Sequence, residues 1–293
     1  MAEFKEWYID TYQQNVMHAL QQKESKLENT VTHKKCEGEK TRFHYIGTRD
    51  MEEITEEFGD TKLTKSDFDT RWAYQKLYGD AFYTDVDDIE NAFTDPTSDM
   101  TRSGVFAANR CKDRCILNAL GANAMTGHDA DIPVAFPSSQ ILDIQTGSPA
   151  AAAANQGLNL TKLKDAACWF DGLELDPDDT RYMLITAKQK RQLLDSVELT
   201  SRDYTPVLAL YENRIDTFLG FKFIMINLLP LDSGIRTCWA YTKNSVGFVP
   251  GKGLTVKSGE VALKNFNRVT QLKIKHGAVR ILDKGVLQVP CAE

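Results

Sequence analysis

Hydrophobic residues recur at helical spacing near the start of the chain. Between residues 4 and 27 they alternate with Gln, Lys and Glu, and they are Phe4, Trp7, Tyr8, Tyr12, Val16, Leu20 and Leu27. This spacing predicts an amphipathic helix. An isolated helix of this kind is only marginally stable, so we expect its apolar stripe to pack against something else.

A strand pattern follows, between about Arg42 and Tyr83. Phe68, Trp72, Tyr74 and Tyr78 all occupy even positions, which places them on one face of a strand. We predict two long strands joined around Gly59-Asp60. Such a hairpin is not stable by itself, and its aromatic face has no obvious partner in the chain, which is typical of an interaction surface.

The strongest helix signal begins at Asp95-Pro96-Thr97-Ser98, which offers capping oxygens and a proline suited to the first helical position. Small and apolar residues then follow at steps of three and four: Met100, Ala107, Ala108, Cys111, Cys115, Ala119 and Ala122. A helix reaching Ala122 would be about 40 Å long. The usual length is about 11–12 residues, so this helix is unusually long.

A compact α/β pattern occupies residues 158–227, after a loop-rich stretch at 126–157. Asn159 can cap a helix that stops near Gly172, and the pattern then predicts a strand at 181–186, a helix at 187–196 and a strand at 217–227. The last strand is hydrophobic on both faces, which predicts a central strand covered by helices.

The apolar run at 218–229 also raises the question of a membrane anchor. Lys222, Asn227 and Pro230 interrupt or end it, and a spanning helix needs roughly 20 apolar residues. The start of the chain has no basic region followed by an apolar stretch, so we expect no secretory signal. We expect the six cysteines to be reduced in a cytosol.

The last part of the chain returns to one-sided strands, marked by Leu272 and Ile274, then Val279 and Ile281, then Leu287 and Val289. Charge is distributed unevenly. Residues 48–95 carry 14 acidic and 5 basic side chains, whereas Lys252–Lys284 carries 8 basic and 2 acidic ones. The total of −6 argues against general affinity for nucleic acid.

No residue pattern in the sequence is strong evidence for a catalytic, nucleotide-binding or metal-binding site. Gly247–Gly253 resembles a phosphate loop, but its glycine spacing and following residue do not fit, which favours a plain turn. Cys111 and Cys115 lack the paired ligands of structural zinc, so packing in a buried helix is the better interpretation. The five histidines are scattered, and no nucleophile elbow occurs.

Two further patterns also favour the plainer interpretation. The acidic group Asp85, Asp87, Asp88 and Glu90 does not match a calcium-binding loop and indicates a solvated turn. The aromatic face at Phe68, Trp72 and Tyr74 could stack on bases, but the surrounding carboxylates would repel phosphate. This favours packing against protein.

The order of these parts resembles the major capsid protein of tailed bacteriophages, which has the HK-97 capsid fold. The resemblance covers nearly the whole chain and is weakest at 1–40 and 128–157. It is carried by "DPTSDMTRSGVFAANRCKDRCILNALGANAMTG" at 95–127, "LNLTKLKDAACWFDGLELDPDDTRYMLITAKQKRQLL" at 158–194, "SRDYTPVLALYENRIDTFLGFKFIMINLLP" at 201–230 and "GAVRILDKGVLQV" at 277–289.

The resemblance implies an α+β fold divided into an arm, an extended hairpin (the E-loop), a peripheral domain with a spine helix, and an axial domain. In this sequence the expected ranges are 1–40 for the arm, 41–84 for the hairpin, 85–127 and 241–276 for the peripheral domain, and 128–240 and 277–293 for the axial domain.

The resemblance also implies a non-enzymatic role in an icosahedral head shell around double-stranded DNA. Subunits would form hexamers and pentamers, with arm and hairpin reaching over neighbours. Further expected partners are a separate scaffolding protein, a portal, possible decoration proteins and DNA contacted non-specifically, without a membrane or cofactor. We expect assembly in the host cytoplasm, residence in the virion and no large proteolytic removal at the N-terminus.

Charge suggests how neighbouring subunits would meet, with the acidic hairpin near the basic segment of the next copy, where the candidates are Lys257, Lys264, Arg268, Lys273 and Lys275. Exposed ion pairs are each worth only about 0–1 kcal/mol, so they would set register and partner choice more than affinity. The expected interface residues are Phe4, Trp7, Tyr8, Tyr12, Glu52, Glu53, Glu56, Phe68, Trp72, Tyr74, Lys257, Lys264 and Arg268.

Two alternatives remain open at this level. An encapsulin-type compartment would use the same fold to enclose enzymes, and it would need a cargo-binding groove that the sequence does not reveal. A soluble α/β enzyme would use Lys252 or the unit at 158–230, yet no acid–base pair, nucleophile or cofactor loop supports it. We also find no set of residues that predicts covalent cross-linking of subunits.

Overall fold

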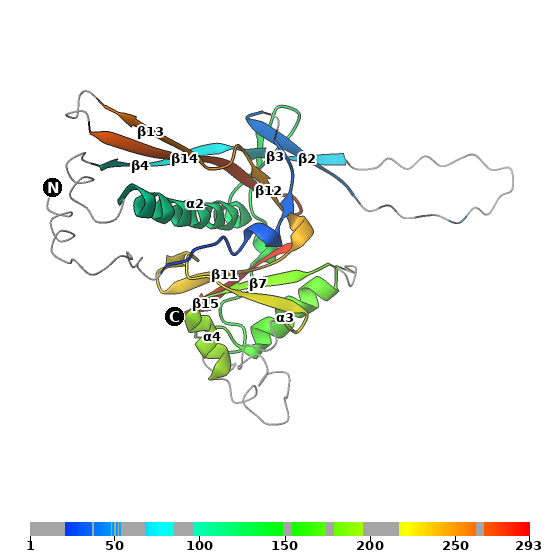
Figure 1. The fold of residues 1–293 in the computed structure, drawn as a ribbon. Coiled ribbons are helices and arrows are strands. Elements are labelled where there is room, and N and C mark those ends of the chain that lie inside the picture. Colours follow the sequence, from blue (N-terminus) through cyan, green and yellow to red (C-terminus); the bar gives the residue numbers. More distant parts are fainter. Residues whose placement is uncertain are drawn as a thin grey trace, which may run out of the picture.

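The structure, a computed structural model, describes residues 21–36, 38–47, 68–84, 96–148, 154–173, 179–195, 217–261 and 267–293, together with Arg49, Met51 and Glu53. The helices in this part of the chain are α2 (Pro96–Gly121), α3 (Leu160–Asp171) and α4 (Ala187–Leu194), with 3-10 turns η2 (Glu28–Thr30), η3 (Ser138–Gln140) and η4 (Lys243–Ser245). Three sheets are arranged around α2 (Figure 1).

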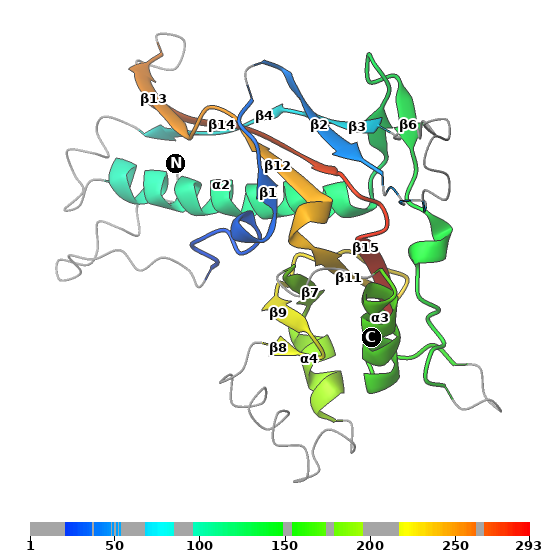
Figure 2. The same ribbon diagram turned by 90° about the vertical axis from the view of Figure 1, so that its right-hand side faces the viewer.

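A five-stranded sheet lies along α2, which covers one of its faces (Figures 1 and 2). Its central strand is β14. This strand pairs with β4 along one edge, and with β13 and then β12 along the other edge. Strand β1 extends the sheet by parallel pairing with β12. The strands are β1 (Thr32–His33), β4 (Lys76–Thr84), β12 (Val246–Pro250), β13 (Thr255–Glu260) and β14 (Arg268–Arg280).

A six-stranded sheet, which carries α3 and α4, lies on the far side of α2 from the five-stranded sheet (Figure 1). Its order is β10-β11-β7-β9-β8, and β15 also pairs with β11. The strands are β7 (Arg181–Ile185), β8 (Thr217–Phe218), β9 (Phe221–Met225), β10 (Leu231–Asp232), β11 (Ile235–Thr242) and β15 (Val286–Ala292).

A third sheet of four strands extends sideways from this body (Figure 1). It contains the hairpin β2–β3, followed by β5 and β6 in the order β2-β3-β5-β6. The strands are β2 (Lys40–Ile46), β3 (Phe68–Tyr74), β5 (Ala124–Thr126) and β6 (Ile132–Val134).

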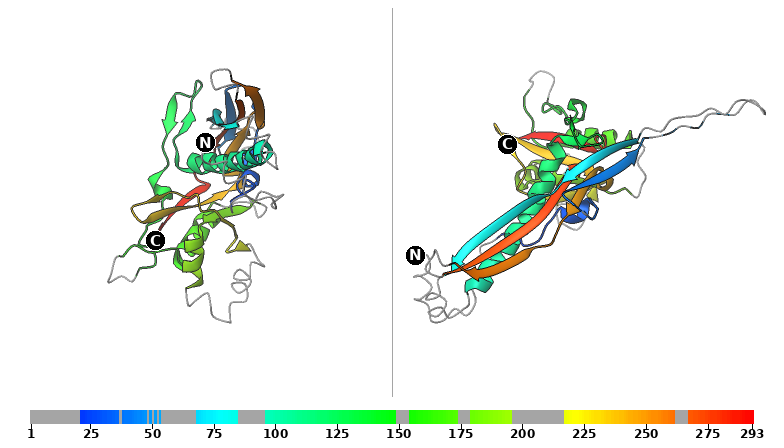
Figure 3. Two further views of the ribbon diagram at one scale, coloured as in Figure 1. Left: turned by 60° about the vertical axis from the view of Figure 1, so that its left-hand side comes forward. Right: turned by 90° about the horizontal axis from the view of Figure 1, so that it is seen from above.

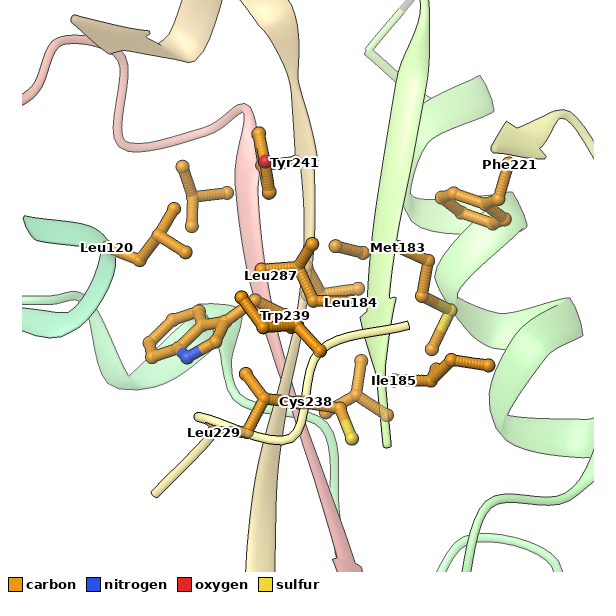
Figure 4. Close-up of a cluster of buried hydrophobic side chains, with 14 of the residues drawn as sticks. Leu120, Met183, Leu184, Ile185, Phe221, Leu229, Cys238, Trp239, Tyr241 and Leu287 are labelled. Atoms are coloured by element: carbon orange, nitrogen blue, oxygen red, sulfur yellow. The ribbon is translucent and has the colours of Figure 1, made fainter. Parts of the chain in front are cut away.

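One hydrophobic cluster joins α2, which is the expected spine helix, to the six-stranded sheet. Leu120 of α2, Trp239 and Tyr241 of β11 and Met183 of β7 are all buried in it (Figure 4). Contact between helix and sheet is close, because a Cβ at Gly121 would lie 3.0 Å from the Trp239 ring. The two layers therefore share a core and do not form independent bodies.

Several predicted elements are confirmed. The long helix α2 begins at Pro96 as expected, and α3 has Asn159 as its N-cap, whose side chain accepts a hydrogen bond from the Lys162 amide. Gly172 ends α3, and β7 and α4 follow in the predicted order. These elements are the ones whose caps and periodicity are encoded locally.

The prediction of two long hairpin strands is wrong for the second strand, which breaks at Gln75. Its first half, β3, pairs with β2 in the hairpin, whereas its second half, β4, belongs to the five-stranded sheet. The backbone crosses β14 at this point: a Cβ at Gly277 would lie 2.2 Å from the Tyr74 carbonyl oxygen. Gly277, far from Gln75 in the sequence, therefore permits the close backbone crossing where the strand breaks.

The apolar run is not a central strand. A turn at Leu219 and Gly220, both with positive φ, divides it into β8 at the sheet edge and β9 beside it. The central strands are instead β7 and β11. In the part of the chain that the structure describes, no helix is long and apolar enough to span a membrane.

Two other predictions need correction. Of the helix predicted at 4–27, residues 21–27 are not helical, and residues 1–20 lie outside the described part. The tail forms two strands where three were expected, because β14 continues from Arg268 to Arg280. Its buried positions shift from even to odd numbers at His276 and Gly277, both buried, so one strand appears as two in the sequence pattern.

Candidate subunit interface

The five-stranded sheet has one face packed on α2 and one face directed away from it. Leu272 of β14 faces the helix, because a Cβ at Gly104 would lie 2.8 Å from its methyl group. Residues opposite one another in an antiparallel pair share a face, and neighbours along a strand alternate. The odd-numbered residues of β14 from Val269 to Lys275, before the shift at His276 and Gly277, and their partners in β4 and β13 therefore point away from α2.

This outward side is both apolar and basic. Leu77 and Tyr83 of β4 are 64% and 55% exposed, although large apolar residues are usually buried. We call this surface the outer face, and its members are Leu77, Tyr83, Lys257, Val269, Lys273 and Lys275. Seen from above, β4, β14 and β13 lie uncovered by any described element over this part (Figure 3). All its charged members are cations.

The structure separates two residues that were predicted to act together. Lys257 belongs to the outer face, but Arg268 lies on the opposite side of the sheet, where its Nε donates to the Ser258 hydroxyl at 2.9 Å. The third predicted cation, Lys264, lies outside the described residues. Lys273 and Lys275, also expected from the sequence as candidates for this contact, do lie on the outer face.

The hairpin carries a second exposed apolar group where its described pairing ends. Ile46 and Phe68 lie opposite each other and are 61% and 73% exposed. Met51 and Glu53, farther along the connection, are exposed as well. Tyr74, at the other end of β3, is partly exposed, and its hydroxyl donates to the Ala130 carbonyl. The predicted residues Glu52 and Glu56 lie outside the described part.

Trp72 differs from the other two predicted aromatics of β3, Phe68 and Tyr74, in being buried. It was expected to lack a partner in its own chain, but it is only 8% exposed. Its indole nitrogen donates to the Gly127 carbonyl at 2.7 Å, and Lys40 and Arg42 lie over its ring. Trp72 therefore joins the hairpin to the β5–β6 turn, a contact that no local pattern in the sequence reveals.

The arm is attached to the spine helix where it enters the described part. Asp113 of α2 is fully buried and accepts hydrogen bonds from the backbone amides of Lys26 and Leu27 and from the side chains of Gln22 and Ser25. Leu27, predicted to belong to a free apolar stripe, is buried in the core. The predicted contacts Phe4, Trp7, Tyr8 and Tyr12 lie outside the described residues.

A charged cluster at the base of the hairpin was not predicted at all. Arg71 of β3 donates to Asp69 at 2.9 Å and to Asp283 at 3.1 Å. Asp283 also accepts from Arg280 at 2.6 Å. Burial opposes ionisation of Asp69, but hydrogen bonds from the Tyr45 hydroxyl, Thr126 and the Thr70 amide, with the Arg71 charge, hold its pKa below the ordinary value. We call Tyr45, Asp69, Arg71, Arg280 and Asp283 the junction.

The weaker chemical candidates find structural explanations. Burial raises the pKa of Cys115 to about 11 and that of Cys111 above its ordinary value, so both thiols stay protonated at neutral pH. Gly247 is part of β12, where a Cβ would lie 2.6 Å from the Phe43 ring. Among the described residues, no group of three His, Cys, Asp or Glu side chains could hold a metal ion. The acidic group from Asp85 to Glu90 lies outside them.

The sequence model of the phage capsid protein family matches residues 4–293. The chain belongs to this family. Its structure is similar to the capsid of cyanophage P-SCSP1u (17% identity, TM-score 0.72, covering 99% of this chain and 94% of the other). It is also similar to structures from Mycobacterium phage Che8 (15%, 0.69, 96% of each) and the capsid of Ralstonia phage GP4 (12%, 0.71, 96% and 95%). None of the curated protein sequences matches it significantly.

These findings confirm the fold and the role expected from the sequence. The fold is the α+β fold of phage capsids, of the HK-97 type, although the sequence identity to these capsid structures is only 12–17%. The capsid protein has a structural role: it associates with copies of itself to form the virion shell of a tailed phage. The outer face, the hairpin and the arm are therefore candidate contacts between copies.

Proposed function

We propose that this capsid protein forms hexamers and pentamers that tile an icosahedral shell around double-stranded DNA, without catalytic activity of its own. The proposed peripheral domain comprises α2 and the five-stranded sheet, including β4. The proposed axial domain comprises the six-stranded sheet with α3 and α4. The hairpin then ends at Gln75, and the tail changes domain between β14 and β15.

The observation that carries this proposal is the outer face, which is apolar and exposed although it belongs to a sheet whose other face is packed. Exposed apolar patches rimmed by charge mark interaction sites. A second copy supplies a matching surface, because its hairpin has exposed Ile46 and Phe68, and Glu53 beyond them. We propose that the hairpin of one subunit lies on the outer face of the next.

Charge complementarity supports this arrangement. The sequence between residues 50 and 60 carries six carboxylates and no basic residue, and the outer face presents Lys257, Lys273 and Lys275. Complementary potentials speed encounter and suppress wrong alignments more than they add affinity. The proposed ion pairs would thus select register between copies, while apolar contact at Leu77 and Tyr83 would supply most of the association energy.

The two faces of one sheet allow a matched test. Lys273→Glu reverses charge on the outer face, whereas Arg268→Glu makes the same change on the opposite side of the same strand. We expect Lys273→Glu to reduce the yield of shells in electron micrographs, and Arg268→Glu to leave it near that of the wild type. Equal yields for the two variants, with both folded, would contradict the docking model.

The remaining partners are proposed from the role of the family. A separate scaffolding protein, a portal and non-specific contact with packaged DNA are expected during assembly in the host cytoplasm. Coexpression of the chain with and without the neighbouring phage genes tests this, because particles that close correctly only in their presence indicate an external scaffold. Correctly closed shells from the chain alone would remove the need for one.

A further inference from the structure

The junction connects three parts of the subunit that carry different contacts. Tyr45, Asp69 and Arg71 belong to the hairpin strands β2 and β3, whereas Arg280 ends β14. Asp283 lies in the connection between β14 and β15, where the chain passes from the five-stranded to the six-stranded sheet.

Arg280 holds the body side of the junction. It is fully buried, and its guanidinium donates to the carbonyls of Leu120 and Ala122, at the C-terminal end of α2, at 2.9 Å each. These carbonyls have no partner within the helix, so Arg280 caps it. Arg280 also lies over the Phe136 ring and donates to Asp283. The position of Asp283 is thereby fixed relative to the spine helix.

Arg71 holds the hairpin side. Its side chain is only 4% exposed, and its two terminal nitrogens bond carboxylates on different parts of the chain, Asp69 within β3 and Asp283 on the body. Planar guanidinium groups fix direction as well as distance. The Nε of Arg71 has no hydrogen-bond partner, so this side chain is placed for its two carboxylates at the expense of one donor.

The connection that carries Asp283 is itself braced. The amides of Ile281 and Leu282 donate to the Ser245 carbonyl at 2.8 and 3.2 Å, in the other described connection between the two main sheets. A Cβ at Gly285 would collide with the Ser245 hydroxyl. The two connections between the main sheets therefore lie side by side and are joined by hydrogen bonds, which gives Asp283 a rigid support.

We propose that the Arg71–Asp283 pair is a latch that fixes the direction of the hairpin relative to the spine helix, and through it the geometry of the contact between subunits. Arg71 and Asp283 are positioning residues in this proposal, since neither belongs to the outer face. The inference rests on the proposed docking of the hairpin on a neighbour. A subunit without the latch would fold and associate, but its hairpin would meet neighbours at variable angles.

Arg71→Met is the sharpest variant. Methionine fills similar space without a charge, although removal of one partner of a buried ion pair usually destabilises a protein. Both carboxylates keep other partners, Asp69 through Tyr45 and Thr126, and Asp283 through Arg280. The control is Arg181→Met, the same substitution in the pair of Arg181 of β7 with Asp171 of α3, away from the hairpin.

Wild-type and variant subunits would be assembled under one condition and imaged by electron microscopy, with thermal unfolding measured on each unassembled subunit. We expect Arg71→Met to raise the share of misshapen particles about tenfold. This corresponds to a loss of about 1.4 kcal/mol in the free-energy preference for correctly shaped over misshapen particles. Arg181→Met should leave particle shape unchanged.

The possible outcomes distinguish a failure of the latch from a failure of the proposed function. Failure of the wild type to form shells under any condition would reject the proposed function. Uniform Arg71→Met shells of wild-type shape would overturn the latch, as would an equal rise in misshapen particles with Arg181→Met. If Arg71→Met does not fold, Asp283→Asn with Asp283→Glu as the conservative rescue is read in the same way.

Discussion

At the scale of single residues, the capsid protein depends on positions whose importance arises only from chain crossings. Gly277 and Asp113 illustrate this, since one permits backbone to pass over backbone and the other collects donors from a distant segment. Neither belongs to a motif. Composition and periodicity describe a residue and its near neighbours, so they do not contain information about contacts made across more than 80 positions.

Gly277→Ala is predicted to destabilise the subunit strongly. The added methyl would lie 2.2 Å from the Tyr74 carbonyl oxygen, and both partners are backbone, so neither can rotate away. Overpacking of this kind costs about 1–3 kcal/mol or more. Gly259→Ala on β13 is the control, because nothing lies within 4 Å of its Cβ position. Chemical denaturation should show a lower midpoint for Gly277→Ala alone.

Asp113→Asn is predicted to loosen the arm. An asparagine retains one acceptor oxygen, but its amide group would face the donors that the carboxylate now accepts from Lys26, Leu27 and Ser25. Leaving buried donors unsatisfied costs about 1–3 kcal/mol. Hydrogen exchange should therefore speed up at the amides of Lys26 and Leu27 while that of β11 stays unchanged. Unaltered protection at both amides would show that Asp113 does not hold the arm.

At the scale of elements, the sequence predicts what is encoded locally. Helices α2, α3 and α4 and strand β7 were found from caps and periodicity because their signals lie within them. The errors occur where a distant segment decides the outcome. Gln75 ends a strand because β14 crosses there, and β9 lies beside an edge because a turn at Leu219 folds the run back. Strand length and sheet order are therefore tertiary properties.

The six-stranded sheet is predicted to lose stability in acid through one side chain. Glu293, which follows β15, binds Arg236 of β11 and Lys188 of α4, and its side chain is 3% exposed. The hydrogen bond with Arg236, followed by those from Gln189 and Lys188, lowers its pKa from 4.5 to about 2. Because the folded pKa lies below the unfolded one, this stabilisation is complete above pH 4.5 and disappears as the pH falls towards 2.

Thermal unfolding between pH 6 and pH 2 measures this effect, with Glu293→Gln as the comparison. The difference in stability between wild type and variant should be largest at pH 6 and should shrink as the pH falls below 4.5. Because the glutamine cannot titrate, the pH dependence of the variant's stability reports the titration of all other groups together. A difference that stays constant down to pH 2 would contradict the assigned pKa.

At the scale of the whole molecule, the chain is organised around surfaces that it cannot cover itself. The hairpin ends in exposed Ile46 and Phe68, and the outer face exposes Leu77 and Tyr83. The sequence did indicate this property, because an acidic early half, a basic late half and an aromatic hairpin are visible without coordinates. Which of the basic candidates share a face was not visible, and the register places Lys273 on the outer face and Arg268 on the opposite side.

Assembly should consequently respond to salt through the outer face. The screening length falls from about 10 Å at 0.1 M to about 3 Å at 1 M ionic strength, so attraction between acidic hairpin and lysine-bearing face weakens while apolar contact does not. We expect the initial rate of shell formation, followed by light scattering, to fall several-fold over this range. Arg268→Glu should keep the same slope, whereas Lys273→Glu should start lower and respond less, because the charge that salt screens has been reversed. A wild-type rate independent of salt would mean that the paired charges do not guide the encounter of subunits, and that apolar contact at Leu77 and Tyr83 alone aligns them.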